Sequence, residues 1–328
     1  MKRRSIISLA LGCGVLSAAG LSPVAHAADD FPNHPIRMIV GYPVGGNVDI
    51  VARIIADELG KSLGQSVVVE NRAGASGQIA AASVAQAAPD GYTIFLGASP
   101  ELAIAHALKK KLPYDAQKDF QPLSLATVIP FALVVNPQVP ATNMQEFEAY
   151  AKAHPGSLNY ASFGNGSSNH LFAELFKSKS GLNMTHVPYK GGGPAMTDLL
   201  GGQVQVEFES LGVVLPHVKA GKLRAIALAM PERSPLAPQL PTMAEVGLSG
   251  LEGGTWNGFV GPAGMPAPVV KKLSAALNDA IKSPSVSKML LEKGLTPSAS
   301  TPKEFADFIS SEVERWKSVA DAAGIRVD

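Results

Sequence analysis

The chain has 328 residues, of which 17% are charged, and its 28 Lys and Arg residues nearly balance 27 Asp and Glu residues, for a formal net charge of +1. This balance lacks the basic excess of nucleic-acid-binding and anionic-membrane-binding proteins, so we expect no nucleic acid among the partners. The length predicts about two domains with substantial cores.

Residues 1–27, MKRRSIISLALGCGVLSAAGLSPVAHA, have the pattern of a secretory signal peptide. Three basic residues precede an apolar stretch that is short for a membrane span, and Ala25-His26-Ala27 is typical of a cleavage site. Lipid attachment at Cys13 is the less favoured alternative, because the residues before it match a lipobox poorly. Cleavage near Ala27 predicts an exported chain without cysteine. It lowers the Lys and Arg count from 28 to 25 against 27 Asp and Glu, and thus the formal charge from +1 to −2.

Strands alternate with helices in the next hundred residues. Apolar runs predict strands at 35–43, 65–72 and 92–99. A helix with one apolar face follows Gly46, and an Ala-rich helix at 77–88 is closed by Pro89-Asp90-Gly91. This order predicts a parallel sheet that is covered by helices on both faces.

A second set of α/β elements follows the long apolar stretch 126–137, which is a candidate crossing between lobes. Its predicted helices lie at 143–153, 170–180 and 194–201, and its predicted strands at 158–162, 185–189 and 204–211. The strand at 223–230 is a candidate for the return crossing. Pro- and Gly-rich sequence at 231–268 leads to helices at 267–282, 285–293 and 302–322, the last with a capping box of Thr301 and Glu304.

These elements predict two lobes of α/β type joined by a two-strand hinge around a central cleft. Residues 28–128 plus 231–328 would form the first lobe, and residues 129–230 the second. Ligands of such sheets bind at the carboxyl ends of strands. The loops 43–49 and 163–170 both lie there.

The first loop places Gly45 and Gly46 directly before a helix. Glycines allow close approach of the backbone, and the free N–H groups of a first helical turn attract an anion. The loop matches no nucleotide motif, because Gly60-Lys61-Ser62 has Ile55 where a P-loop needs its first glycine. A tight turn that needs positive φ remains the alternative interpretation.

The second loop, SFGNGSSNH from Ser162 to His170, repeats this design with Gly164, Gly166, Ser167, Ser168 and Asn169. One hydroxyl or amide is enough to cap a helix, and three in succession exceed that need. One helix start contributes about 0.3–1 kcal/mol to anion binding, whereas micromolar affinity needs about 8 kcal/mol. The two loops together are therefore more informative than either alone.

Catalysis has little support in the sequence. No G-x-S-x-G elbow is present, and the 7 histidines show no zinc-binding spacing, so we expect no catalytic residue, metal or cofactor. His170 is either a base or, as we favour, a histidine that hydrogen-bonds its own loop. Glu207 and Glu209 are either a paired-carboxylate site or solvated residues on one strand face.

The chain resembles the Bug-type solute-binding proteins of the tripartite tricarboxylate transporter family. The resemblance covers residues 32–325 and includes YPVGGNVDIVARIIADELG, APDGYTIFLG, LPYDAQKDFQPLSL, LNYASFGNGSSNHL and HVPYKGGGPAMTDLLGGQV in this order. It implies a type II-like periplasmic-binding-protein fold, a periplasmic location, a monomer and no cofactor. The implied partners are membrane transporter subunits and a small organic acid, which remains open between dicarboxylate, amino acid and aromatic acid.

The resemblance also implies that the two loops hold a carboxylate as pincers. The implied binding residues are Tyr42, Gly45, Gly46, Asn47, Asp49, Ser99, Ser162, Gly164, Gly166, Ser167, Ser168, Asn169, His170, Glu209 and Ser210. We expect Asp49 to orient its helix, since a carboxylate repels another. The chain departs from the family pattern at Val44, Asn47 and Val48, and in reading Glu209-Ser210 after Phe208. A cleft-facing Glu209 would favour a ligand with an ammonium group. An orphan receptor that signals to a sensor protein, and a cleft hydrolase, are the alternative functions.

Overall fold

The computed structural model describes residues 31–108 and 111–325, so the predicted signal peptide and its cleavage site lie outside the described residues. The strands are β1 (Ile36–Val40), β2 (Val67–Asn71), β3 (Thr93–Ala98), β4 (Phe120–Val135), β5 (Asn159–Ser162), β6 (Thr185–Pro188), β7 (Val206–Ser210), β8 (Arg224–Leu228), β9 (Gly254–Pro262) and β10 (Thr296–Pro297). They join one sheet in the order β2-β1-β3-β9-β4-β7-β5-β6, and β8 and β10 pair with β4 beside this path.

The helices follow the predicted alternation with the strands. They are α1 (Asn47–Leu63), η1 (Ala75–Gly77), α2 (Gln78–Ala85), η2 (Pro100–Ile104), α3 (Ala105–Ala107), α4 (Met144–Ala153), α5 (Ser168–Ser180), α6 (Gly192–Leu200), α7 (Leu211–Lys219), α8 (Ala267–Lys282), α9 (Pro284–Glu292) and α10 (Pro302–Ala322). The predicted capping box of Thr301 and Glu304 opens α10. Among the described residues, none of these helices has the length and apolar character of a membrane span.

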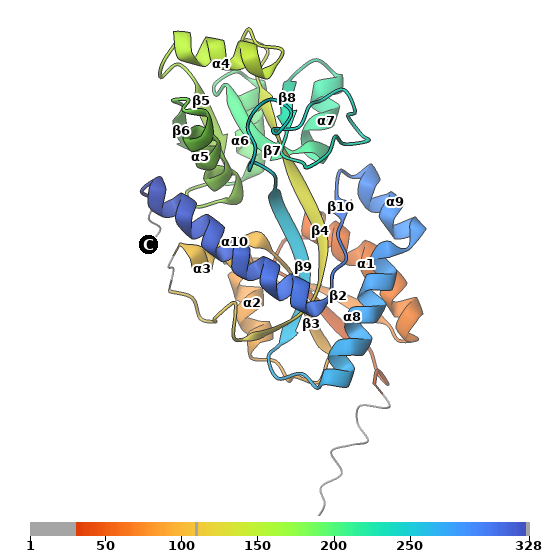
Figure 1. Cartoon of the computed structure of the whole chain (residues 1–328). Helices are drawn as coiled ribbons and strands as arrows, with labels where there is room; N and C mark the ends of the chain where they lie inside the picture. Colours follow the sequence, from red (N-terminus) through yellow and green to blue (C-terminus); the bar gives the residue numbers. More distant parts are fainter. Residues whose placement is uncertain (1–30, 109–110, 326–328) are drawn as a thin grey trace, which may run out of the picture. The chain divides into compact units, whose positions relative to one another are not determined.

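The long strand β4 belongs to both parts of the sheet (Figure 1). Up to Pro130 it pairs antiparallel with β9, and from Phe131 onward it pairs antiparallel with β7. Because β9 is also antiparallel to β3, β4 runs in the direction of β1 to β3. The strands β5 and β6 are parallel to β7 and so run the opposite way. The carboxyl ends of β1 to β3 therefore face the carboxyl ends of β5 to β7.

The chain crosses between the two parts of the sheet at β4 and again just before β9. At this point Phe131 accepts from the N–H of Ala229 at 2.8 Å and donates its own N–H to the carbonyl of Gly253 at 3.3 Å. A Cβ on Gly254 would lie 2.1 Å from the carbonyl oxygen of Ile129, so only glycine fits there. The two crossings are thus in direct contact.

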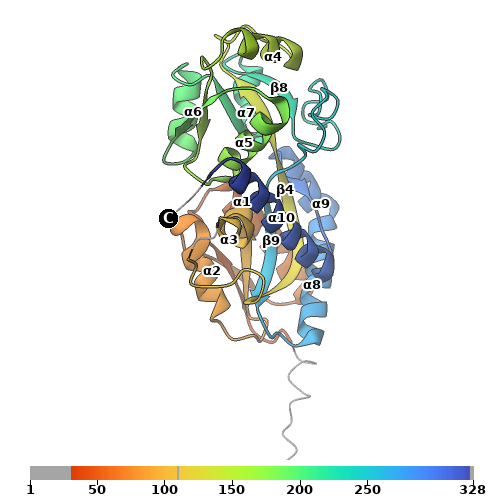
Figure 2. The ribbon, with the colours of Figure 1, turned by 60° about the vertical axis from the view of Figure 1, so that its left-hand side comes forward.

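Helices cover both faces of each part of the sheet (Figures 1 and 2). On the first part, α2, α3 and α10 pack on the face that bears Ile39 and Phe95, and α1, α8 and α9 cover the other face. On the second part, α5 packs against Phe208, while α6 and α7 cover Val134 and Ala161. This layering matches the α/β class that the alternation predicts.

Several elements differ from the sequence-based expectation, among them the short segments η1, η2, α3 and β10, which were not predicted. The Pro- and Gly-rich segment 231–268, for which no strand was predicted, contains the central strand β9. Its glycines lie where a side chain would not fit: a Cβ on Gly258 would lie 2.0 Å from Phe305 Cζ. The helix α7 was not predicted, since its apolar run lacks a clear period and contains Pro216. The strand β8 is not itself a crossing, because it pairs with β4 inside the second part.

The segment between β8 and β9 returns to the second part of the sheet before it crosses. Leu228 donates its N–H to Pro241 and accepts from Met243, and Ala237 and Leu240 join the core cluster of α6 and α7. The assignment of residues 231–328 to the first lobe remains a prediction. These contacts favour placing its boundary nearer to Gly253.

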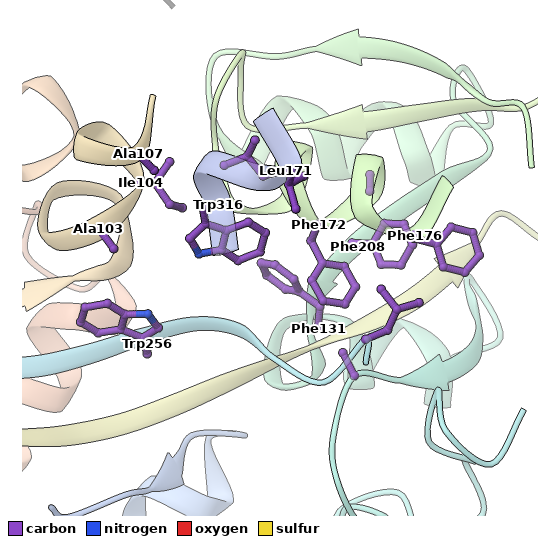
Figure 3. Packing of buried hydrophobic residues seen from close by; sticks show 14 of the residues in the cluster. Ala103, Ile104, Ala107, Phe131, Leu171, Phe172, Phe176, Phe208, Trp256 and Trp316 are labelled. Atoms are coloured by element: carbon purple, nitrogen blue, oxygen red, sulfur yellow. The ribbon is translucent and has the colours of Figure 1, made fainter. Parts of the chain in front are cut away.

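The helix α10 contacts both parts of the sheet through Trp316, and a carboxylate on the same helix binds two tryptophans (Figure 3). Trp316 on α10 lies among Ile104 and Ala107 on one side and Leu171 and Phe172 of α5 on the other. The buried carboxylate of Glu312 accepts from the indole N–H of Trp316 at 2.9 Å and from that of Trp256 on β9 at 3.1 Å.

We predict that Glu312→Ala destabilises the chain by about 2–5 kcal/mol. It leaves two buried indole N–H groups without an acceptor, at about 1–3 kcal/mol each. Urea unfolding followed by circular dichroism measures the loss. The control is Glu314→Ala on the same helix, where the side chain is 73% exposed and lies 3.9 Å from Lys317, and we expect it to stay within about 0.5 kcal/mol of the parent. Equal effects of the two variants would contradict the role of Glu312.

Candidate functional site

One cavity of about 780 Å³ lies where the strand ends of the two parts face each other. Its lining comes from the starts of α1, α2, α5 and α6 and from the segment η2–α3: Tyr42, Pro43, Gly46, Ser76, Gln78, Pro100, Ile104, Ala105, Leu108 and residues 163–168 and 191–193. None of these residues carries a charged side chain. Within the described chain, the site therefore offers an anion backbone N–H groups and neutral polar side chains.

The carboxylate of Asp49 fixes the first predicted loop through hydrogen bonds. This group accepts from the N–H of Gly45 and from Asn71 Nδ2, both at 2.9 Å, and from the guanidinium of Arg53 at 3.0 Å. Burial raises the pKa of Asp49, but the hydrogen bonds from Arg53, Gly45 and Asn71 outweigh it and hold that pKa below its ordinary value. Asp49 thus orients the loop and is absent from the cavity lining, as expected.

Within the described residues, the N–H groups of Asn47 and Val48 at the start of α1 have no protein acceptor. The helix begins after Gly46 without a side-chain cap. The side chain of Asn47 is exposed and does not line the cavity. An uncapped helix start carries partial positive charge. This end of α1 is therefore free to receive an anion.

The second predicted loop is shaped by hydrogen bonds to its own helix. Asn169 Oδ1 accepts from the N–H of Phe163 at 3.1 Å and from Ser167 Oγ at 2.9 Å. Gly164 and Gly166 have φ values of 125° and 73°, which other residues adopt at a cost. In the described chain the N–H groups of Ser168 and Asn169 have no protein acceptor. Two donors of α5 thus remain available.

A stacked pair of histidines supports this loop from behind. His170 Nδ1 accepts from the N–H of Gly166 at 3.0 Å, which confirms the expectation of a histidine bound to its own loop. The His170 ring stacks on that of His186, with centroids 3.9 Å apart and planes 8° apart. His186 Nε2 lies 2.6 Å from Ser162 Oγ, which in turn accepts from the N–H of Gly164. Ser162 and His170 are therefore supports rather than lining residues.

Burial lowers the pKa of both histidines. The pKa of His186 falls to about 4 because of burial and then of the neighbouring His170 and Lys177, against the opposing charge of Glu174. The pKa of His170 is lowered by burial and by Lys177, also against Glu174. Both rings are neutral at neutral pH, which leaves His170 Nδ1 free to accept from the loop.

A third glycine loop, Gly191–Gly193, lines the cavity at the start of α6. Gly191 has a φ of 108°, and a Cβ on Gly192 would lie 3.2 Å from the ring of Phe163. This loop is not among the binding residues predicted from the sequence. The signal was present, since a strand followed by three glycines and a helix repeats the pattern of the other two loops.

The start of α2 adds a fourth polar region to the lining, one that was not predicted from the sequence. Its first N–H groups have partners, since Gly77 donates to the carbonyl of Gly74 and Gln78 to that of Ala75. Ser76 and Gln78 line the cavity, and Ala75 and Ser76 hold φ values of 47° and 51°, which are unfavourable for residues other than glycine. Tyr42 also lines the cavity and donates its hydroxyl to Glu101 Oε2 at 2.8 Å. Burial raises the pKa of Glu101 to about 8, against the lowering effect of hydrogen bonds from Ala98 and Tyr42.

Glu207 and Glu209 are both buried, so the interpretation of solvated residues is wrong. Burial raises the pKa of Glu209 to about 7, and burial with the charge of Glu209 raises the pKa of Glu207 to about 9. Glu209 Oε2 would lie 3.6 Å from a Cβ on Gly192, so this carboxyl sits beneath the third loop. Neither glutamate is part of the lining. Ser210 caps no group with its side chain and is buried beside them.

The cavity brings together six of the sequence-predicted residues: Tyr42, Gly46, Gly164, Gly166, Ser167 and Ser168. The others lie next to the lining or beneath it: Gly45, Asn47, Asp49, Ser99, Ser162, Asn169, His170, Glu209 and Ser210. Ser99 is fully buried and bonds Thr255 Oγ1 at 2.7 Å. A direct ligand contact for any of them remains a prediction.

Comparisons with known proteins agree with this architecture. A family model described as Tripartite tricarboxylate transporter family receptor matches residues 51–325. Protein BugT of Bordetella pertussis is 38% identical over 318 residues, which are 97% of each chain. MatC from Rhodopseudomonas palustris with bound malate is 36% identical, with a TM-score of 0.74, and covers 88% of this chain and 99% of its own. R. palustris Rpa4515 with adipate is 35% identical, with a TM-score of 0.80, and covers 90% and 99%. These matches confirm the family resemblance and the two-lobe α/β fold class.

We predict that acid destabilises the chain through the histidine pair. The fold favours the neutral rings, so their contribution is complete above a pH of about 6.5 and is lost as the pH falls toward about 4. We expect His186→Gln to reduce the pH-dependent loss of unfolding free energy by on the order of 1–2 kcal/mol, after allowance for solvent screening.

Urea unfolding at several pH values between 7.5 and 4 measures this difference. His154→Gln, which changes an exposed histidine after α4, is the matched control. Superimposable pH profiles of the parent and His186→Gln would contradict the assignment.

Proposed function

We propose that this chain, which belongs to the family of tripartite tricarboxylate transporter receptors, captures a small organic carboxylate between its two lobes and delivers it to a membrane transporter. The carrying observation is the convergence of uncapped helix starts on a cavity without charged lining side chains. A receptor of this kind would act in the periplasm after removal of residues 1–27, as a monomer and without a cofactor.

The magnitudes support a carboxylate ligand. One helix start contributes about 0.3–1 kcal/mol to anion binding, and up to about 2 kcal/mol where it is partly buried. The starts of α1, α5 and α6 all border the cavity, so together they contribute up to about 6 of the roughly 8 kcal/mol of a micromolar complex. The neutral polar side chains of the lining add to this contribution. Two relatives of known structure have bound carboxylates, malate in MatC and adipate in Rpa4515. Dicarboxylates, amino acids and aromatic acids are all candidate ligands.

The binding residues follow from the same geometry. We infer that Asn47, Ser168 and Gly192 present backbone N–H groups to the carboxylate and that closure of the lobes brings the loops together around it. Asp49 and His170 act through the loops that they hold. A site built from backbone N–H groups recognises the carboxylate of the ligand more than the rest of the ligand. This agrees with the different carboxylates, malate and adipate, that are bound by relatives.

The hydrolase alternative has one observation in its favour, the 2.6 Å contact between Ser162 Oγ and His186 Nε2. A nucleophile must reach its substrate. The Ser162 side chain is fully buried, its hydroxyl is also engaged with Gly164, and it does not line the cavity. We therefore infer that the pair is structural and that bound carboxylates are released unchanged.

We predict that Asn165→Asp weakens binding of malate and adipate by roughly 10- to 100-fold. The exposed side chain of Asn165 lines the cavity, and a negative charge a few ångströms from a carboxylate costs about 1–3 kcal/mol at an effective dielectric constant between those of water and the protein surface. Isothermal titration calorimetry of the complete chain measures the affinity. The matched control is Asn183→Asp, an exposed asparagine outside the cavity. An unchanged affinity of Asn165→Asp for both acids would contradict the placement of the carboxylate in this cavity.

Transport and sensing predict different results in cells. We expect a strain that lacks the chain to lose uptake of the radiolabelled acid that the purified chain binds, and to regain it when the chain is restored. A receptor for a sensor protein would leave uptake unchanged and alter transcription in response to the acid. The uptake rate therefore separates delivery from the signalling alternative.

A further inference from the structure

One wall of the cavity is apolar. It is formed by the short helical segment η2–α3, which contributes Pro100, Ile104, Ala105 and Leu108 to the lining. The donor-bearing loops of α1, α5 and α6 form the rest of the lining together with the start of α2. The cavity therefore has one end suited to a carboxylate and another suited to hydrocarbon.

Two polar side chains within or next to this segment of the chain, Ser99 and Glu101, are turned away from the cavity. Ser99 is fully buried and bonds Thr255 Oγ1 at 2.7 Å. Glu101 is fully buried as well, and its two oxygens accept from the N–H of Ala98 at 2.7 Å and from the hydroxyl of Tyr42 at 2.8 Å. Both residues thus form their hydrogen bonds with other groups of the protein. The side chains of the wall that line the cavity are all hydrocarbon.

This arrangement discriminates between the two ends of a ligand. Among the described residues, no charged side chain lines the cavity, so attraction for an anion comes from the helix starts and from neutral polar side chains outside this wall. A second carboxylate placed against Ile104 and Leu108 would lose hydration without gaining a side-chain donor. Such a transfer is strongly unfavourable for a charged group. A methyl or ring end placed there would instead bury apolar surface.

We propose that the ligand is a monocarboxylate with an apolar chain or ring, whose body packs against Pro100, Ile104, Ala105 and Leu108. This inference rests on the proposed function and narrows it from carboxylates in general to those with an apolar far end. The cavity volume of about 780 Å³ falls within the usual range for small-molecule sites and accommodates a six-carbon chain.

Calorimetric titration of the complete chain with hexanoate, adipate, malate and propionate tests the inference. Hexanoate and adipate have six carbons each and differ in the second carboxylate. We expect hexanoate to bind at least tenfold more tightly than adipate. We also expect the Kd to fall about fourfold for each methylene between propionate and hexanoate, as burial of about 0.8 kcal/mol per methylene implies.

The outcomes separate this inference from the proposed function. Adipate or malate binding as tightly as hexanoate, or more tightly, overturns the apolar-end proposal and leaves the carboxylate receptor standing. Failure of all four acids to bind, together with failure of benzoate and glutamate in the same titration, overturns the proposed function and this inference with it. A preference for hexanoate supports both.

A matched pair of substitutions locates the apolar end. Ala105 and Ala107 are both 3% exposed and lie on the same short helix, but only Ala105 is part of the lining. We expect Ala105→Ser to weaken hexanoate about three- to tenfold while the affinity for propionate stays unchanged. Ala107→Ser should leave the ratio of the two affinities as in the parent. An equal change of this ratio in both variants would overturn the placement.

Discussion

The strand β4 is the constraint on which the site depends. Because it is continuous through both parts of the sheet and antiparallel to β7, the strands on its two sides run in opposite directions. Their carboxyl ends, and with them the loop–helix junctions, must face each other. A parallel sheet leaves such junctions at one edge. Here a single shared strand places two such edges on opposite sides of one cavity.

Recognition by backbone donors requires the loops to be rigid, and the polar side chains near the cavity serve that purpose. Asp49 holds Gly45, His170 holds Gly166, and Glu101 holds Tyr42. Each lies beneath the lining rather than in it. This explains why the acidic residues and histidines near the cavity support the site but do not line it. Preorganised dipoles of this kind need no rearrangement when the anion arrives.

Much of this arrangement is readable from the sequence, since each loop has the local pattern of strand, glycine and helix start. The alternation gave the α/β class, and the first two loops line the cavity as the pattern indicates. The Gly191–Gly193 loop has the same local pattern and could have been predicted, whereas the other missed features depend on tertiary packing. The glycines of β9 resemble a loop until Phe305 is seen to occupy the space of a side chain at Gly258. Likewise, the orientation of Glu101 and Ser99 away from the cavity depends on partners 59 and 156 residues distant.

The buried glutamates show how an anion site tolerates acidic neighbours. Burial raises the pKa of Glu101 to about 8, of Glu207 to about 9 and of Glu209 to about 7. The fold favours the protonated form of each glutamate. The contribution of each to the free energy of unfolding therefore decreases as the pH rises from about 4.5 toward these values. Glu101 and Glu209 lie beneath Tyr42 and Gly192, and in the protonated form these two carboxyls place no negative charge beside the cavity.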